Sequence, residues 1–436
     1  MDREKMKKIK VLYYPYKVIR RSVMYILNEV HYRASLYYIE KNKSYVKKKI
    51  NNGEVLNVVF VVQYIPGWNK LEPIYTRMKQ DSRFHPVIVC VPLNIQNHKL
   101  MDRNGNDTYQ YFVEHGYDAI DALQNDGSWF DLKSLQPDYL FHSRPYNHFM
   151  PPCYTSGQIR KYTLICNVLY GANLTKNAED VTLNRNYYRD VAIYFSFDKD
   201  EELFYEKRFK PGCKRVIQEC LPYGAIGLEQ ILCCKPDKKD DSCFEKKVLW
   251  TPRWSTDSYI GGSNFFNYRS MIFDLAKNNP NVLFIIRPHP LMFGNFIKTG
   301  EMTEQDVMIF KNYCKNEYNI ILDESKEYYN QFWNSDLLIT DASGIVPEYF
   351  VTGKPILYCH SSANFKYNDY ILDMINTCYQ VNSKEELLHD FYKIIVGNDE
   401  KRNDRQTLIS ESYRSVQSNS INILKFLKGE RDNDIS

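Results

Sequence analysis

The sequence predicts an α/β protein with two doubly wound, Rossmann-like domains. Short apolar runs alternate with helical segments along most of the 436 residues, and a charge-dense stretch, residues 232–246, separates two such series. Alternating strands and helices favour a mainly parallel sheet. A chain of this length exceeds what a single core usually holds, so two domains are expected.

The first 50 residues form a basic N-terminal arm. They contain 14 Lys/Arg and 4 Asp/Glu, a net charge of +10, whereas the remainder has 43 basic and 49 acidic residues, or −6. Apolar residues recur near the helical period of 3.6, which predicts an amphipathic helix over residues 16–40: Ile19, Val23, Ile26, Val30 and Tyr37. Such a helix suits an anionic membrane surface.

Two other roles for the basic arm are open. It can pack on the body of the protein and leave a basic face in solvent. It can also bind a polyanion such as nucleic acid, but no known nucleic-acid motif accompanies it, so we expect no nucleic-acid partner.

The first Rossmann-like domain is expected over residues 51–232, with a helix at 70–79. Its strands are predicted from apolar runs bounded by turn residues at 55–62, 85–91, 117–121, 138–142, 162–170, 190–197 and 215–221.

The second domain is expected over residues 247–400, followed by a C-terminal helical segment, 401–436. Strands are predicted at 247–250, 282–287, 319–322, 336–340 and 355–358, and helices near 268–278, 303–317, 326–333, 344–352, 384–396 and 403–428.

Composition narrows the class of protein. The chain is 44% hydrophobic and 15% aromatic, which is typical of a globular protein. No run of 18 apolar residues or secretory signal is present, so neither a spanning helix nor export is expected. Its 11 cysteines show no CxxC or zinc spacing, which favours reduced thiols in the cytoplasm.

Residues 335–358 form the most informative segment. A strand ends at Thr340, then Asp341, Ser343 and Gly344 open a helix. The free N–H groups and partial positive charge of a helix N-terminus suit a phosphate. Glu348, one turn later, could accept hydrogen bonds from ribose hydroxyls. An ordinary βαβ unit with a capped helix gives the same pattern.

Two further strand ends carry side chains suited to phosphate. Arg253 follows the strand near 248–251, and Arg287 and His289 follow the strand near 282–287. Ligands of parallel α/β sheets gather at the carboxyl ends of strands, and guanidinium groups match phosphate oxygens. His289 could hydrogen-bond a diphosphate or protonate a leaving group. No Asp-x-Asp pair is evident, so we expect no essential metal or cofactor.

The second domain resembles the CDP-glycerol:glycerophosphate glycerophosphotransferases, the family of teichoic acid polymerases and primases. The resemblance covers about 120 residues and lies in three motifs: Thr251-Pro252-Arg253-Trp254, Arg287-Pro288-His289-Pro290, and Leu338 to Gly344 with Glu348 and Gly353-Lys354-Pro355. It implies a GT-B-like fold whose two domains face a cleft.

The resemblance also implies a reaction. An acceptor hydroxyl would attack the β-phosphorus of a CDP-alditol donor, with CDP-glycerol as the family's donor, and CMP would leave. The acceptor would be a cell-wall or capsule polymer or its lipid-linked primer, and the enzyme would sit on the inner face of the cell membrane. Arg253, Arg287, Thr340, Asp341, Ser343, Gly344 and Glu348 would bind the donor.

The sequence departs from the family pattern in two places. The family's WHG motif corresponds to Asn167-Val168-Leu169-Tyr170-Gly171, so Tyr170 stands where a catalytic histidine is expected, and Gly344 replaces the second serine of the phosphate turn. These departures indicate a divergent capsule or cell-wall branch. Tyr170 would orient the acceptor, because a phenol with a pKa of about 10 is a poor base. His142 is the second candidate base, and nearby Arg144 could hold an acceptor phosphate.

Other functions fit the same residues. A GT-B glycosyltransferase or a sugar-nucleotide epimerase would use this second domain to bind UDP or a related nucleotide. A non-catalytic assembly factor at the membrane is the third reading, because Tyr170 replaces the expected base.

Overall fold

The computed structural model divides the chain into two compact units. Unit 1 comprises Met1–Leu169, Leu183–Gly224 and Ile421–Ser436, and unit 2 comprises Tyr170–Thr182 and Ala225–Ser420. The residues described are 10–101, 105–142, 144, 146–168, 171–172, 174, 185–197, 199, 201–203, 217–233, 243–258, 261–325, 328–361 and 365–430.

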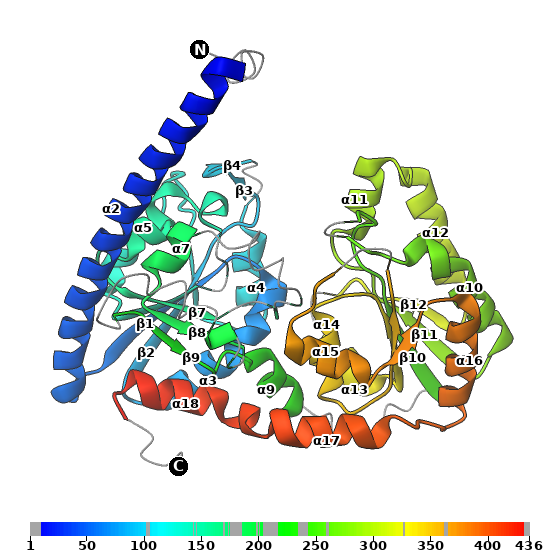
Figure 1. The fold of residues 1–436 in the computed structure, drawn as a ribbon. Helices are drawn as coiled ribbons and strands as arrows, with labels where there is room; N and C mark the ends of the chain where they lie inside the picture. The colour runs from blue at the N-terminus through cyan, green and yellow to red at the C-terminus, as the bar shows by residue number, and fades with distance from the viewer. Residues whose placement is uncertain are drawn as a thin grey trace. The chain divides into compact units, whose positions relative to one another are not determined.

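Unit 1 is built on a seven-stranded sheet in the order β5-β2-β1-β6-β7-β8-β9 (Figure 1). All of its strand pairs are parallel. The strands are β1 (Leu56–Val62), β2 (Phe84–Cys90), β5 (Ala119–Asp121), β6 (Tyr139–His142), β7 (Leu164–Val168), β8 (Ile193–Phe195) and β9 (Glu219–Leu221). Each corresponds to one of the predicted runs.

The described helical segments of unit 1 connect these strands. They are η1 (Ile65–Lys70), α3 (Glu72–Gln80), α4 (Asp107–Glu114), η2 (Leu132–Leu135), η3 (Asn147–Phe149), η4 (Pro152–Tyr154), α5 (Ser156–Ile159) and α7 (Arg185–Asp190). A short antiparallel pair, β3 (Ile95–Gln96) and β4 (Lys99–Leu100), lies outside the main sheet. The strand order reverses between β1 and β6, so the ligand-binding edge of this sheet lies beyond Val62 and His142.

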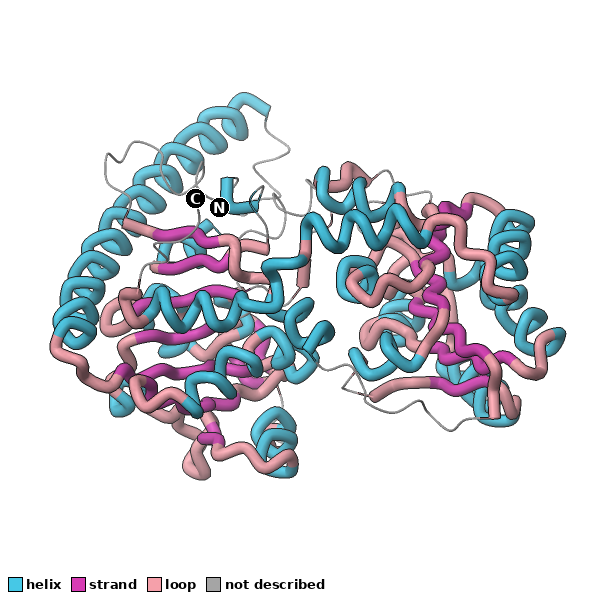
Figure 2. Tube along the Cα trace, turned by 90° about the horizontal axis from the view of Figure 1, so that it is seen from below, coloured by secondary structure: helices cyan, strands magenta, loops and turns pink. Residues whose placement is uncertain are grey.

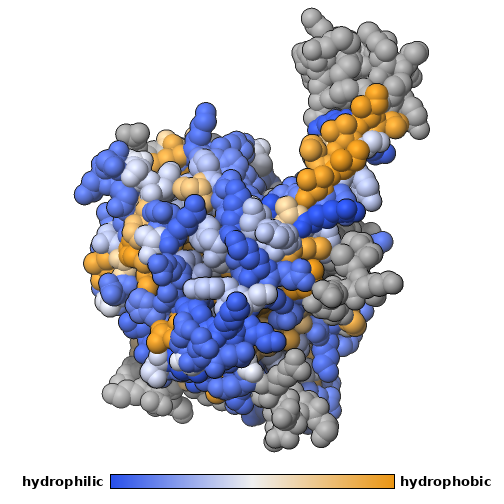
Figure 3. All heavy atoms as spheres, turned by 90° about the vertical axis from the view of Figure 1, so that its left-hand side faces the viewer, coloured by the Kyte–Doolittle hydropathy of each residue, from blue (hydrophilic) through white to orange (hydrophobic). Residues whose placement is uncertain are grey.

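A single long helix, α2 (Lys10–Asn51), precedes the first strand. Its contact with the body is made by residues spaced three and four apart, which place one stripe of the helix against unit 1: Tyr32, Ser35, Ile39, Asn42 and Val46. The apolar stripe predicted from the sequence lies on another face, and all five of its residues are between 48% and 63% exposed. Figure 3 shows apolar side chains gathered on the part of α2 that extends from the body.

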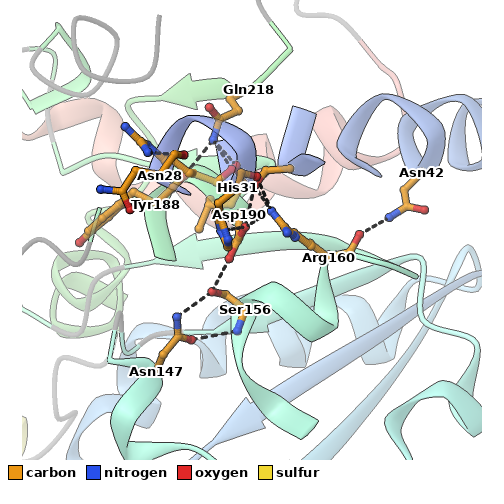
Figure 4. A network of polar contacts seen from close by, with 12 residues as sticks. Asn28, His31, Asn42, Asn147, Ser156, Arg160, Tyr188, Asp190 and Gln218 are labelled. Atoms are coloured by element: carbon orange, nitrogen blue, oxygen red, sulfur yellow. Dashed lines mark hydrogen bonds and ion pairs between the residues drawn. The ribbon is translucent and has the colours of Figure 1, made fainter. Parts of the chain in front are cut away.

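A buried polar network fixes the packed half of α2 (Figure 4). The carboxylate of Asp190, at the end of α7, accepts hydrogen bonds from Ser35 at 2.7 Å and Arg160 at 2.7 Å, and lies 2.8 Å from Nε2 of His31. Its other oxygen accepts from Ser156 at 2.7 Å. Because a buried carboxylate without such partners is costly, these bonds specify where the helix docks.

Unit 2 contains a six-stranded parallel sheet in the order β12-β11-β10-β13-β14-β15. Its strands are β10 (Lys246–Thr251), β11 (Val282–Ile286), β12 (Ile320–Leu322), β13 (Leu337–Thr340), β14 (Ile356–Cys359) and β15 (Tyr379–Val381). Numbered along the unit, this order is 3-2-1-4-5-6, that of dinucleotide-binding domains, and the direction reverses between β10 and β13.

Helices cover both faces of the second sheet (Figures 1 and 2). Helices α10 (Phe265–Asn278), α12 (Glu304–Asn316) and α16 (Lys384–Ile395) pack with β10 and β11 in one core that includes Trp250, Phe284 and Phe391. The other described helical segments are α9 (Ile226–Cys233), α11 (Met292–Thr299), α13 (Tyr329–Asn334), α14 (Ile345–Phe350), α15 (Asp369–Asn376), α17 (Arg402–Ser412) and η5 (Arg414–Ser418), with α18 (Asn419–Leu427) leading back into unit 1.

Four elements of unit 2 were not expected from the sequence, and three others were expected as one. The unexpected elements are α9, α11, α15 and β15; each has at most eight residues, too few for a clear periodic signal. The segment 403–428, expected as one helix, is interrupted by the 3-10 turn η5 between α17 and α18.

Candidate functional site

Asp341 ties three segments together at the point where the strand order of unit 2 reverses. Its carboxylate accepts the backbone N–H of Arg253 at 3.0 Å and the backbone and side-chain N–H groups of Asn264 at 3.2 and 3.0 Å. Burial raises the pKa of this carboxyl to about 6, although these hydrogen bonds and the Arg253 cation oppose the shift. Asp341 therefore positions the loops after β10 and β13, and its oxygens face protein donors.

The hydroxyl of Thr340 is also hydrogen-bonded within the protein. It is buried at the end of β13 and accepts a hydrogen bond from Thr251 Oγ1 at 2.7 Å while donating to the Thr251 carbonyl at 3.2 Å. Side-chain contact between adjacent strand ends holds β10 and β13 in register. Thr340 and Asp341 thus lie beneath the surface on which a ligand would sit.

Arg253 and His289 lie next to each other above this layer. The Arg253 guanidinium donates to the carbonyl of Ala342, and its centre lies 5.4 Å from the ring of Phe365. Burial, aided by the Arg253 cation, lowers the pKa of His289 to about 4. The backbone N–H of His289 donates to Pro252 at 3.3 Å, so strands β10 and β11 bring the two residues together.

The imidazole of His289 is held in one tautomer. Its Nδ1 accepts the backbone N–H of Leu291 at 3.1 Å, which places the proton of the neutral ring on Nε2. The ring is half-buried and lies beside Trp254, with 6.4 Å between ring centres. Around neutral pH the side chain can therefore donate one hydrogen bond but carries no positive charge.

The turn from Asp341 to Gly344 remains partly open. Ser343 and Gly344 are half-buried, and a Cβ atom added to Gly344 would meet no atom within 4 Å. The Ser343 hydroxyl makes a long contact of 3.4 Å with the N–H of Ile345, the first residue of α14. Ser343 and Gly344 directly follow Ala342, whose carbonyl accepts a hydrogen bond from the Arg253 guanidinium.

Arg287 and Glu348 belong to a second cluster, linked by Tyr328. The Arg287 guanidinium pairs with Asp323 at 2.5 Å, donates to the Ser325 carbonyl at 2.6 Å and lies 5.5 Å from the centre of the Tyr328 ring. The Tyr328 hydroxyl donates to Glu348 at 2.7 Å. Glu348 is buried, so this bond fixes the direction of its carboxylate.

Lys354, from the Gly-Lys-Pro motif, has a structural contact set. Its ammonium donates to the carbonyls of Phe332, Trp333 and Ser335 at 2.9, 2.5 and 2.6 Å, at the C-terminal end of α13. A cation at a helix C-terminus is favourable because unpaired carbonyls gather there. Burial lowers the pKa of Lys354 to about 8.

In unit 1, His142 lies in the interior. Its side chain is 3% exposed, and Nδ1 lies 3.1 Å from the Tyr187 hydroxyl. Burial and the Arg144 cation lower its pKa to about 3. A neutral, enclosed imidazole favours a structural role over that of a base that meets an acceptor. Tyr170, the other candidate, lies outside the described residues.

Arg144 occupies the edge where the strand order of unit 1 reverses. It donates to the side chain of Gln63 at 2.8 Å, just beyond β1. Its guanidinium centre lies 5.0–5.8 Å from the ring centres of Tyr64, Tyr146 and Phe149. Stacked aromatic rings hold a guanidinium in place without neutralising its charge.

Sequence reasoning missed Asn264 and Tyr328. Asn264 anchors Asp341 and also donates to the carbonyls of Cys359 and His360 at 3.2 and 3.1 Å. Its position directly before a long helix was the only sequence signal, and that signal is common to many caps. Tyr328 joins Arg287 to Glu348 across strands, which no local pattern reveals.

Among the described residues, no group of three or more His, Cys, Asp or Glu side chains is arranged to hold a metal ion. No described helix has both the length and the hydrophobicity needed to cross a bilayer.

One protein family matches part of the chain. Residues 236–420 match the sequence model of the family described as CDP-Glycerol:Poly(glycerophosphate) glycerophosphotransferase. This match confirms the resemblance seen in the sequence. No curated protein sequence matches the chain significantly.

Solved structures share the fold of most of the chain. The UDP-GlcNAc 2-epimerase from Neisseria meningitidis bound to UDP-GlcNAc has a TM-score of 0.56 at 14% identity, covering 85% of this chain and 99% of its own. The wall teichoic acid polymerase TagF has a TM-score of 0.53 at 13% identity, covering 94% and 97%. The UDP-GlcNAc 2-epimerase from Methanocaldococcus jannaschii, in complex with UDP-GlcNAc and UDP, has a TM-score of 0.52 at 12% identity, covering 85% and 100%. The expected two-domain, GT-B-like α/β fold is thus confirmed.

Proposed function

We propose that this transferase moves an alditol phosphate from a CDP-activated donor to a hydroxyl group. The hydroxyl belongs to a cell-wall or capsule polymer or to its lipid-linked primer. The match of residues 236–420 to the CDP-glycerol glycerophosphotransferase family supports this proposal. Glycerol phosphate is the expected group, and CMP is the released product. One observation carries the proposal beyond family membership: Arg253, His289 and the Ser343–Gly344 turn meet at the switch point of the second sheet, between β10 and β13.

In the proposed reaction the acceptor oxygen attacks the β-phosphorus of the donor. A new P–O bond forms, the bond to CMP breaks, and the acceptor proton passes to a base. Such a transfer depends on positioning and on stabilising negative charge more than on covalent catalysis. Arg253 supplies a cation whose place is fixed by the Ala342 carbonyl, and the backbone of the Ser343–Gly344 turn supplies N–H groups for phosphate oxygens.

His289 then acts as a hydrogen-bond donor to the diphosphate. With a pKa lowered to about 4, the ring is neutral at physiological pH and offers Nε2–H. A hydrogen bond to a bridging or non-bridging oxygen would strengthen as charge moves onto CMP. The lowered pKa favours this role over full protonation of the departing CMP.

Glu348 is proposed to bind the ribose of the cytidine. Its carboxylate is aligned by the Tyr328 hydroxyl, and Arg287 packs against the same tyrosine ring. Arg287 would thus support donor binding through Tyr328, since its own guanidinium is already paired with Asp323.

For the acceptor, Arg144 is the proposed phosphate anchor, because it combines a charge with a fixed position among three aromatic rings. Tyr170 is proposed to orient the acceptor hydroxyl, on the basis of its place in the family's WHG motif.

Helix α2 is proposed to bring the enzyme to the inner face of the cell membrane. The contact with unit 1 uses one stripe, while the apolar stripe from Ile19 to Tyr37 stays exposed. Exposed apolar side chains flanked by Arg20 and Arg21 suit the boundary between acyl chains and anionic headgroups. A lipid-linked acceptor would be met at that surface.

A donor screen tests the proposed reaction. The full chain is incubated with a lipid-linked phosphopolymer primer and with CDP-glycerol, CDP-ribitol or UDP-sugars, and the release of CMP or UDP is measured. Release of CMP that depends on both primer and CDP-alditol is expected. Turnover of UDP-sugars alone would instead identify a glycosyltransferase or epimerase.

Single substitutions test whether the chain is an enzyme or a non-catalytic assembly factor. We expect His289→Ala to reduce CMP release at least about 100-fold while the circular dichroism spectrum is retained. His85→Ala, at an exposed position on β2, is the matched control and should keep wild-type activity. Lack of CMP release from the wild-type chain with every donor and primer would favour the assembly-factor reading.

A further inference from the structure

Unit 2 contains a polar cavity that the reaction above does not use. It encloses about 550 Å³ beyond the carboxyl ends of β14 and β15, between the N-terminal ends of α10 and α16. Neither Arg253 nor His289 nor the Ser343–Gly344 turn lines it. A volume of this size is within the range of small-molecule sites.

One wall of the cavity is formed by Asn264 and Gly262. Asn264 is buried and lines the cavity. Its side-chain N–H groups donate hydrogen bonds to the carboxylate of Asp341 and to the backbone carbonyls of Cys359 and His360. Gly262 adopts a φ of +87°, and an added Cβ would lie 2.5 Å from the Ser361 hydroxyl oxygen. Glycine is therefore required at this position of the wall.

The other lining groups offer mostly hydrogen-bond acceptors. Nε2 of His360 lies 2.9 Å from the amide oxygen of Gln380 and must donate to it, so Nδ1 is left as an acceptor. Asn267 and Asn382 each use the amide nitrogen, toward Asn264 at 3.0 Å and Glu386 at 3.3 Å, and no described residue donates to their side-chain oxygens. Three neutral acceptors match a ligand that carries several hydroxyl groups.

Lys384 adds one cation to this lining. It is exposed at the first position of α16, and its ammonium makes no ion pair with any described residue. The nearby Glu386 carboxylate accepts a hydrogen bond from the backbone N–H of Asn382 at 2.7 Å. No Asp or Glu side chain is among the residues that line the cavity. One cation beside hydroxyl-binding groups suits a single phosphate ester.

We propose that this cavity binds an alditol phosphate unit at a second site, distinct from the donor site. The inference rests on the proposed function, since that reaction makes and extends chains of such units. The ligand is either a free alditol phosphate or a non-reacting unit of the acceptor polymer, which the cavity holds while the chain end reacts elsewhere.

Binding without turnover tests the site. The full chain is titrated calorimetrically, in the absence of any CDP-alditol, with sn-glycerol 3-phosphate and with a synthetic trimer of glycerol phosphate. Lys384→Met should weaken binding of the phosphate ester about tenfold, because a charge-assisted contact is lost. Lys277→Met removes an exposed lysine at the far end of α10 and should leave the affinity unchanged.

A cavity-filling variant gives an independent check. Asn267 is exposed on the first turn of α10, so Asn267→Trp should block the cavity and abolish binding of the ester without disturbing the core. Tighter binding of the trimer than of the monomer assigns the site to polymer, and equal binding assigns it to the free ester. Wild-type affinity in both Lys384→Met and Asn267→Trp, or equally tight binding of inorganic phosphate, would overturn the proposal. Because no CMP is measured, failure of the donor screen does not decide this result.

Discussion

The backbone N–H of Arg253, in the loop after β10, donates to the carboxylate of Asp341, in the loop after β13, at 3.0 Å. The two residues are 88 positions apart in the chain, but the strands that precede them are adjacent in the sheet. The bond joins the two loops that carry the proposed phosphate contacts, so Asp341 shapes the site without facing the ligand.

Replacement of Asp341 should therefore cost stability as well as activity. In Asp341→Ala the N–H groups of Arg253 and Asn264 lose their buried acceptor, and we expect the free energy of unfolding to fall by about 3 kcal/mol. Urea denaturation measures the change. Asp336→Ala, at the half-exposed opposite end of β13, is the control and should cost about 1 kcal/mol or less. Equal losses in the two variants would contradict the anchoring role.

His289 should make stability depend on pH. Its pKa is lowered from 6.5 to about 4 in the folded chain, so the unfolded chain binds the proton more readily. The stabilisation is complete above pH 6.5 and is lost as the pH falls toward 4. Between pH 7 and pH 5 the unfolding free energy of the wild type should fall by about 2 kcal/mol more than that of His289→Gln.

This difference is measured by urea titrations at the two pH values. The His85→Gln variant removes an exposed histidine and should follow the wild type. Parallel pH profiles for wild type and His289→Gln would contradict the lowered pKa of His289.

Donor affinity should depend on the chain of contacts from Arg287 to Glu348. Arg287→Ala removes the cation beside Tyr328 and the partner of Asp323, and should weaken binding of CDP-glycerol by about 1.5–3 kcal/mol. Tyr328→Phe removes only the hydroxyl that aligns Glu348, and should cost about 1 kcal/mol. Calorimetric titration gives both values. Lys311→Ala breaks an exposed pair with Glu324 and serves as control; if it weakens binding as much as Arg287→Ala, the effect is nonspecific.

The exposed stripe of α2 should control membrane binding. Ile19→Ser combined with Ile26→Ser removes two side chains that are about 60% exposed, and should reduce sedimentation with phosphatidylglycerol vesicles at least about tenfold. Met308→Ser with Ile309→Ser makes a similar change on an exposed part of α12. Equal vesicle binding by both double variants and the wild type would refute a membrane role for this stripe.

The sequence by itself determined the α/β class, most strand positions and the resemblance of the second domain to the glycerophosphotransferase family. These properties rest on local patterns: buried parallel strands are continuous apolar runs, and a phosphate turn needs its residues in consecutive positions. The apolar stripe of α2 was also visible, because helical periodicity alone places Ile19, Val23 and Ile26 on one face.

Only the tertiary structure decided which polar residues are available to a ligand. Thr340, Asp341 and Lys354 stand in the same motifs as Ser343, yet their polar atoms bind Thr251, Asn264 and the end of α13. It also decided that α2 docks through Tyr32, Ile39 and Val46 and not through the predicted stripe. The physical reason is that hydrogen-bond partners and packing surfaces come from segments far apart in the chain, and the strand order that brings them together is not written in any local pattern.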